Sequence, residues 1–167
     1  MLRIKITLDK TLEWFCVALF VVLVVDVTWQ VFTRQVLNDP SGWSEELAKY
    51  VFIWLGLFGS SLVFGERGHI AVDFAVRKTP EQIQRIIAIF VQISIIVFAI
   101  VVLIQGGYKV SVLAWNQNLT GLPVNVGWLY VALPITGFLT VFYSLFHLVG
   151  LIRGSTAALD TEDPDVI

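Results

Sequence analysis

The sequence contains a single cysteine, Cys16, and few charged residues. One thiol cannot form an internal disulfide, a CxxC redox pair or a cysteine zinc site, which excludes the four-helix membrane thiol oxidoreductases. Charged residues make up 14% of the 167 positions and the net charge is −2. This balance excludes the large basic surface that nucleic-acid binding requires. The sequence shows no nucleophile–base pair, phosphate loop or metal-ligand cluster, so we expect neither an enzyme nor a bound cofactor.

Apolar residues dominate what remains. They account for 57% of the chain, against about 45–50% in soluble domains. They are concentrated in four blocks, each long enough to approach the roughly 20 residues that cross a bilayer. We therefore predict an all-α integral membrane protein with four transmembrane helices, at about residues 11–37, 43–65, 86–104 and 123–152.

The first block is interrupted by an acidic residue, Asp26. Burying it costs about 2.5–3.5 kcal/mol, whereas the nine Val, Leu or Phe residues between Phe15 and Val25 return about 3–5 kcal/mol. Insertion is therefore still favoured. The basic start of the chain resembles a signal peptide, but the helical pattern continues past Val25 without a small-x-small cleavage site. We expect a retained first membrane helix.

The positive charges indicate the orientation. Four spans place both termini on one side, which would hold eight Lys or Arg residues, against three on the other side. The positive-inside rule then places both termini in the cytoplasm. Between helices two and three, residues 70–78 are too short to span and predict an interfacial segment. We expect one transmembrane domain over 1–154, followed by an acidic, disordered cytoplasmic tail over 155–167.

Asp26, Gln30 and Arg34 recur every four residues and form one polar stripe on the first helix. Lipid disfavours such a stripe, so it should face protein or water. A polar seam against another helix or subunit explains it, and so would an ion or proton path.

Trp43, Glu45, Glu46 and Lys49 open the second helix. Acidic residues there complement the helix dipole, and Glu45 stands four residues before Lys49, as in a favourable ion pair. Two other interpretations stay open: these acids dock a partner, or Glu46 pairs with Arg34 across the turn.

Small residues follow within the same helix. Gly56, Gly59 and Ser60 provide the spacing that lets membrane helices approach closely. We expect close packing there, within the chain or with a partner. The two histidines, His69 and His147, offer a different function, because histidines on facing helices can ligate a haem.

Several of these motifs together resemble a known family. Arg34 closes the first helix, Trp43-Ser44-Glu45-Glu46 opens the second, and Gly68-His69-Ile70-Ala71-Val72-Asp73 follows it. This pattern resembles the small permease subunit, DctQ type, of tripartite ATP-independent periplasmic (TRAP) transporters. The distinctive part covers about Arg34 to Asp73. The resemblance marks His69 and Asp73, like the other motif positions, without assigning them a role.

The resemblance implies a function that the residues alone do not give. Such transporters use a sodium gradient to take up organic acids, including C4-dicarboxylates and sialic acids, across the bacterial inner membrane. A periplasmic protein captures the substrate, and a large elevator permease holds the substrate and sodium ions. The small subunit is implied to be a non-catalytic scaffold in contact with lipid, the large permease and, transiently, the binding protein. The alternatives are a small cytochrome with haem between His69 and His147, or a self-sufficient exporter that uses Asp26.

Overall fold

The computed structural model describes residues 2–66 and 80–153. The predicted interfacial segment over 70–78, the acidic tail, His69 and Asp73 therefore lie outside the described residues. The helices, including two π-helical segments labelled η, are α1 (Leu2–Phe32), η1 (Thr33–Leu37), α2 (Gly42–Glu66), α4 (Glu81–Phe98), η2 (Ala99–Gly106), α5 (Gly107–Leu113) and α6 (Gly127–Arg153).

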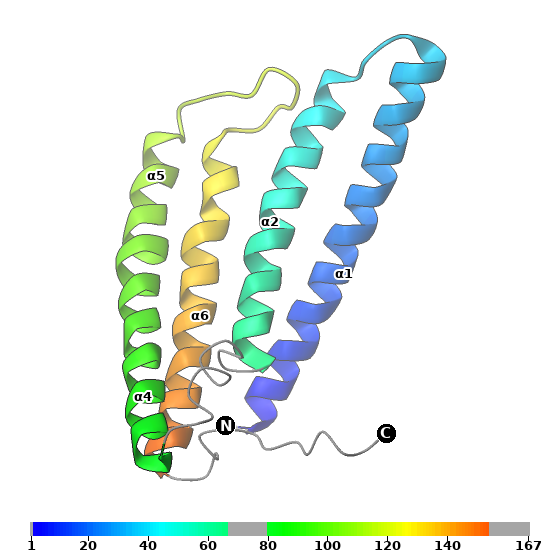
Figure 1. Cartoon of the computed structure of the whole chain (residues 1–167). Helices are drawn as coiled ribbons and strands as arrows, with labels where there is room; N and C mark the ends of the chain where they lie inside the picture. The colour runs from blue at the N-terminus through cyan, green and yellow to red at the C-terminus, as the bar shows by residue number, and fades with distance from the viewer. Residues whose placement is uncertain (1, 67–79, 154–167) are drawn as a thin grey trace, which may run out of the picture.

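The prediction of an all-α protein with four membrane-length helices is confirmed. The four apolar stretches are Lys5–Leu37, Gly42–Gly65, Gln82–Leu113 and Gly127–Ile152. Within 2–66 and 80–153 the structure contains no β-strand, and its β pairing is limited to an isolated antiparallel bridge between Asn118 and Asn125. The turn over 38–41 and the loop over 114–126 lie at one end of the molecule, which we call the loop end (Figure 1).

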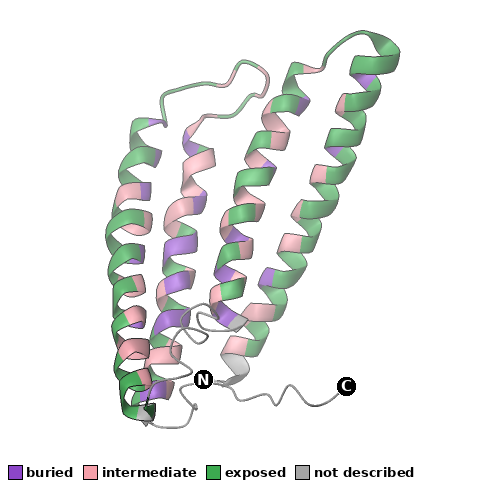
Figure 2. Cartoon of the chain, viewed as in Figure 1, coloured by how far each residue is buried: buried purple, intermediate pink, exposed green. Residues whose placement is uncertain are grey.

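The helices form a single row. α1 packs on α2, α2 on α6, and α6 on the third span, which consists of α4, η2 and α5 (Figure 1). Within the described part of the chain, the backbone of α1 approaches no other span. Figure 2 shows buried residues on the sides that face a neighbour, whereas α1 is mostly exposed. A row, unlike a closed bundle, leaves two broad apolar faces uncovered.

Local sequence explains where the spans turn. Asn38 adopts a left-handed conformation (φ 53°), and its N–H donates to the Thr33 carbonyl oxygen, which ends η1. Asparagine tolerates this conformation better than most residues. The Ser41 hydroxyl then donates to the Ser44 hydroxyl at 2.9 Å as α2 begins. Pro80 precedes α4, where its missing N–H costs no helical hydrogen bond.

The first helix begins at Leu2, nine residues before the predicted start at Thr11. Lys5 Nζ donates to Asp9 Oδ2 at 3.0 Å, so these charges extend the helix by an i, i+4 pair. The buried Tyr143 of α6 donates its hydroxyl to Asp9 Oδ1 at 2.6 Å. This contact ties the base of α1 to α6, two helices along the row.

The third span continues nine residues beyond its predicted end at residue 104. Gly106-Gly107 lies inside it, and the helix runs on to Leu113. Gly107 is buried against α6, where a Cβ atom would lie 2.6 Å from Leu133 Cβ. Reciprocally, a Cβ atom on Gly137 of α6 would lie 2.7 Å from Ile104 Cγ1. The two spans therefore approach closely beside η2, and α6 continues through Pro134.

Candidate functional site

Charged clusters are scarce in the described chain. Within 2–66 and 80–153, no group of three His, Cys, Asp or Glu side chains lies close enough to hold a metal ion. The polar features singled out from the sequence are therefore the candidate sites, together with the surfaces that surround them.

The three members of the polar stripe on α1 have different environments. Asp26 is 5% exposed, Gln30 is half-buried and Arg34 is exposed. α2 is the helix that packs along α1, so Asp26 lies on the protein side rather than the lipid side. Neither oxygen of Asp26 has a hydrogen-bond partner among the described residues. Burying a carboxyl group without a hydrogen-bond donor is unfavourable. The contacts within the described chain therefore do not explain why an acidic residue stands at this position.

Glu46 has contacts that the sequence did not indicate. Its Oε1 accepts a hydrogen bond from Thr120 Oγ1 at 3.0 Å, and its Oε2 accepts one from the Gly121 backbone N–H at 2.9 Å. Gly121 also packs against the start of α2, where a Cβ atom would lie 2.8 Å from the Gly42 carbonyl oxygen. One turn further along, the Tyr50 hydroxyl donates to the Asn125 carbonyl oxygen at 3.4 Å. Glu46 thus joins α2 to the loop over 114–126.

This loop is itself ordered as a narrow hairpin. The Val126 N–H donates to the Gln117 carbonyl oxygen at 2.8 Å, and the Leu119 N–H donates to the Val124 carbonyl oxygen at 3.2 Å. At its base, the rings of Trp115 and Trp128 pack with centroids 5.6 Å apart. Most of this segment lies between the predicted third and fourth spans, but no pattern in the sequence indicated its hairpin form. Its exposed amide side chains are Asn116, Gln117 and Asn118.

The two ion pairs considered at the start of α2 are not formed in the described structure. Glu45 and Lys49 are exposed and make no ion pair with each other, and Arg34 makes none with Glu46. Glu46 is instead engaged by the hairpin, and in water an exposed i, i+4 pair gains little. Trp43 is also exposed. Whether Glu45 docks a partner stays a prediction.

The small residues of α2 face open space. Nothing among the described residues would lie within 4 Å of a Cβ atom at Gly56 or Gly59, and Ser60 donates to the Gly56 carbonyl oxygen. Close packing within the chain occurs at other glycines, such as Gly65, where a Cβ atom would lie 2.7 Å from the Tyr143 ring. Close packing at Gly56 and Gly59 remains a prediction, now for a partner.

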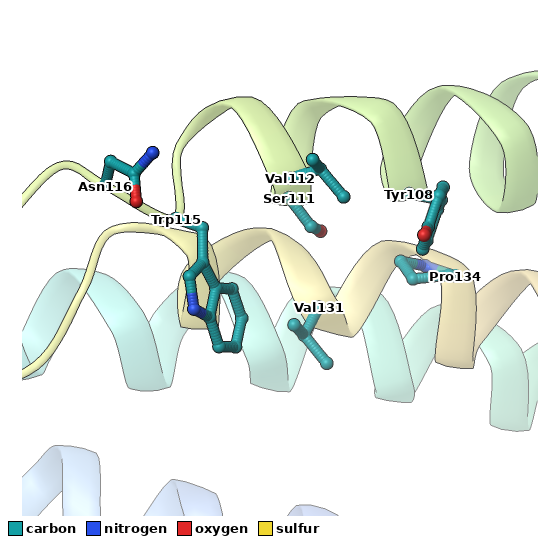
Figure 3. A pocket seen from close by; sticks show the side chains of 7 residues that line it. All are labelled: Tyr108, Ser111, Val112, Trp115, Asn116, Val131 and Pro134. Atoms are coloured by element: carbon teal, nitrogen blue, oxygen red, sulfur yellow. The ribbon is translucent and has the colours of Figure 1, made fainter.

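A cavity of about 500 Å³ lies between α5 and α6 near the loop end (Figure 3). None of the described residues that line it carries a formal charge, and the Trp115 ring lies beside α6 there. No periodic pattern in the sequence predicts this cavity, because its walls come from separate spans. They are Tyr108, Ser111, Val112, Trp115, Asn116, Val131 and Pro134.

The described structure provides no support for a haem held between His69 and His147. His147 is half-buried on α6, and its ring packs edge-on to Phe146 with centroids 6.0 Å apart. His69 lies outside the described residues, so the structure does not place the two imidazole rings relative to each other.

Comparison with known proteins agrees with the motifs. The family model described as "Tripartite ATP-independent periplasmic transporters, DctQ component" matches residues 22–154. A sialic acid TRAP transporter small permease protein, SiaQ, of Vibrio cholerae is 30% identical over 157 residues, which cover 92% of this chain and 90% of that protein. A putative TRAP transporter small permease protein of Haemophilus influenzae is 24% identical over 89% of each chain.

A third relative places the same region in a longer protein. The sialic acid TRAP transporter permease protein SiaT of Haemophilus influenzae is 30% identical over 141 residues, which cover 81% of this chain but 22% of that protein. The family is one of transport components rather than enzymes. The match over most of the chain, together with the four apolar spans, shows that this multi-pass protein of the bacterial inner membrane belongs to the DctQ family of TRAP transporter small permeases.

Proposed function

We propose that this chain is the non-catalytic scaffold subunit of a sodium-coupled TRAP transporter that imports an organic acid. In this proposal a large permease subunit holds the substrate and the sodium ions. A periplasmic substrate-binding protein delivers the substrate to the loop end, which faces the periplasm.

The single-row arrangement of the helices carries the proposal. Two apolar faces remain uncovered, with large exposed side chains such as Trp14, Phe90 and Phe138. A transporter that works alone needs a central, polar and enclosed site, usually flanked by broken helices. A row of four helices encloses no such centre, whereas it suits a subunit that lies against a larger membrane protein.

The relatives support both the partner and the substrate class. In the longer SiaT protein, the region like this chain is joined to further sequence, which supports a large permease beside it. Two relatives named for sialic acid align over 92% and 81% of this chain. One named for C4-dicarboxylates aligns over 56% and one named for isethionate over 86%. The compounds in these names are all organic anions, and sialic acid is the first substrate to test.

The test is transport by the reconstituted system. The chain is co-purified with the large permease of its own source and placed in proteoliposomes, with the periplasmic protein outside. We expect uptake of sialic acid or a C4-dicarboxylate that requires an inward sodium gradient. Uptake that is indifferent to sodium would contradict the coupling, and a haem absorbance band in the purified chain would favour the cytochrome alternative.

A further inference from the structure

We propose that Glu46 is a positioning residue: it holds the hairpin over 114–126 in the form that receives the periplasmic binding protein. This inference rests on the proposed function, since it assumes a transporter with three components. It concerns a carboxylate of the chain's own α2, acting on a loop 74 and 75 residues away.

The contacts of Glu46 have the geometry of a clamp. Both carboxylate oxygens are used, each by a different residue of the hairpin tip, Thr120 and Gly121. Hydrogen bonds to an ionised carboxylate are roughly twice as strong as neutral ones. The close approach of Gly121 to Gly42 leaves no room for a side chain, so the tip fits against α2 in one way. Exposed loops are among the more mobile parts of a protein, so these two bonds should add to the hairpin's own backbone hydrogen bonds in holding its tip.

The fixed hairpin presents a surface that suits a protein. It lies beyond the ends of the candidate spans at Leu113 and Gly127, and residues 114–126 contain no Lys, Arg, Asp or Glu. A hairpin without Lys or Arg has no positive charge to attract lipid phosphates, whereas the exposed amides of Asn116, Gln117 and Asn118 both donate and accept hydrogen bonds, as the polar rim of a protein interface does. Glu45, exposed beside Glu46 in sequence, adds a negative charge at this end.

Holding the hairpin before binding should strengthen docking. A loop that is already ordered loses less conformational freedom when a partner binds it. Loosening the clamp should therefore raise the concentration of loaded binding protein needed for half-maximal uptake. The maximal rate should change little, because in the proposed function the substrate site lies in the large permease and not in this chain.

The experiment compares Glu46→Gln with the matched control Glu45→Gln in the full three-component transporter. Glutamine removes the negative charge and replaces one acceptor oxygen with an amide donor. The Thr120 hydroxyl must then reverse its role and accept, and both contacts become weaker neutral hydrogen bonds. For Glu46→Gln we expect faster hydrogen exchange at residues 117–126 and a half-saturating concentration raised about fivefold, the equivalent of one hydrogen bond. Glu45→Gln should leave the hydrogen exchange of the hairpin unchanged, because in the described structure Glu46, not Glu45, is bonded to its tip.

A second variant keeps the test decisive if Glu46→Gln fails to fold. Thr120→Val removes the hydrogen bond to Glu46 Oε1 from the exposed hairpin side, and we expect a smaller effect in the same direction. Unchanged exchange in Glu46→Gln would overturn the clamp, and so would equally fast exchange in Glu45→Gln. Faster exchange with an unchanged half-saturating concentration would overturn the docking role.

The two proposals can fail separately. If uptake by the unsubstituted transporter did not depend on the binding protein, the proposed function would fail, and with it the docking role of Glu46. Hydrogen exchange needs no binding protein, so it would still decide whether Glu46 holds the hairpin.

Discussion

At the scale of single residues, the described structure is held together by polar contacts between distant parts of the chain. The Asp9 carboxylate accepts a hydrogen bond from Lys5 of its own helix and another from Tyr143 of α6, 134 positions away. The Glu46 carboxylate accepts hydrogen bonds from Thr120 and Gly121 at the tip of the hairpin. Between α2 and α6, the buried Ser61 hydroxyl donates to the Thr136 carbonyl oxygen at 3.4 Å. Such contacts matter in a membrane protein, where helices gain little from hydrophobic association with one another.

The contact between Tyr143 and Asp9 can be tested by removing one oxygen atom. Tyr143→Phe leaves the ring in place and should lower the free energy of unfolding by about 1.5 kcal/mol, as expected for a buried hydrogen bond to a charged group. The measurement is unfolding of the purified chain in detergent. Tyr108→Phe is the control, because Tyr108 is 66% exposed. Equal stability of the two variants would refute a stabilising role for this contact.

Residue-level predictions from the sequence succeeded in part. The first helix was expected to start at about Thr11, but it begins at Leu2, where Lys5 and Asp9 pair one turn apart. The role of Glu46 was not predictable, since its partners are 74 and 75 positions away and Thr120 and Gly121 have no distinctive pattern. The spacing of Asp26, Gln30 and Arg34 indicated one stripe, but not that Asp26 alone is buried.

At the scale of helices, hydropathy was sufficient to predict the four spans, because a bilayer requires about 20 apolar residues and a fully bonded backbone. The order of the helices in the row was not predictable. Large apolar side chains occur on most faces of these helices, so hydrophobic periodicity does not identify the side that meets a neighbour. The π-helical segment η2 left no signal either, because its residues are ordinary apolar ones that suit an α-helix equally well.

The close approach of the third span to α6 makes opposite predictions for two glycines. Gly107→Ala places a Cβ atom 2.6 Å from Leu133 and should destabilise the isolated chain by about 1–3 kcal/mol through overpacking. Gly56→Ala meets no described atom within 4 Å and should stabilise the helix by about 0.5–1 kcal/mol. Unfolding in detergent measures both. If Gly107→Ala were as stable as Gly56→Ala, the two spans would not pack as described.

At the scale of the whole molecule, the row of helices explains why one chain can be so apolar and yet bury so little. α1, at the edge, is mostly exposed, and α6, in the interior of the row, is the most buried span. The uncovered face of α2 around Gly56 and Gly59 is one place where a partner helix can approach closely. The membrane protein is therefore described best as part of an assembly.

The orientation of the row in the membrane is a prediction from the charge asymmetry, and it can be measured directly. We expect a reporter fused after Asp39, in the turn of the loop end, to be active in the periplasm. A reporter fused after Ile167 should be active in the cytoplasm. Both reporters active on the same side would contradict the four-span topology, and a reversed pattern would contradict the placement of the hairpin outside.

The most direct measurement compares uptake in three matched sets of proteoliposomes, each with the periplasmic protein outside and an inward sodium gradient. The first contains this chain alone, the second the large permease alone, and the third both. A scaffold without a substrate site of its own predicts no uptake in the first set, little in the second and full uptake in the third. Sodium-driven uptake by this chain alone, or full uptake by the large permease without it, would contradict that role.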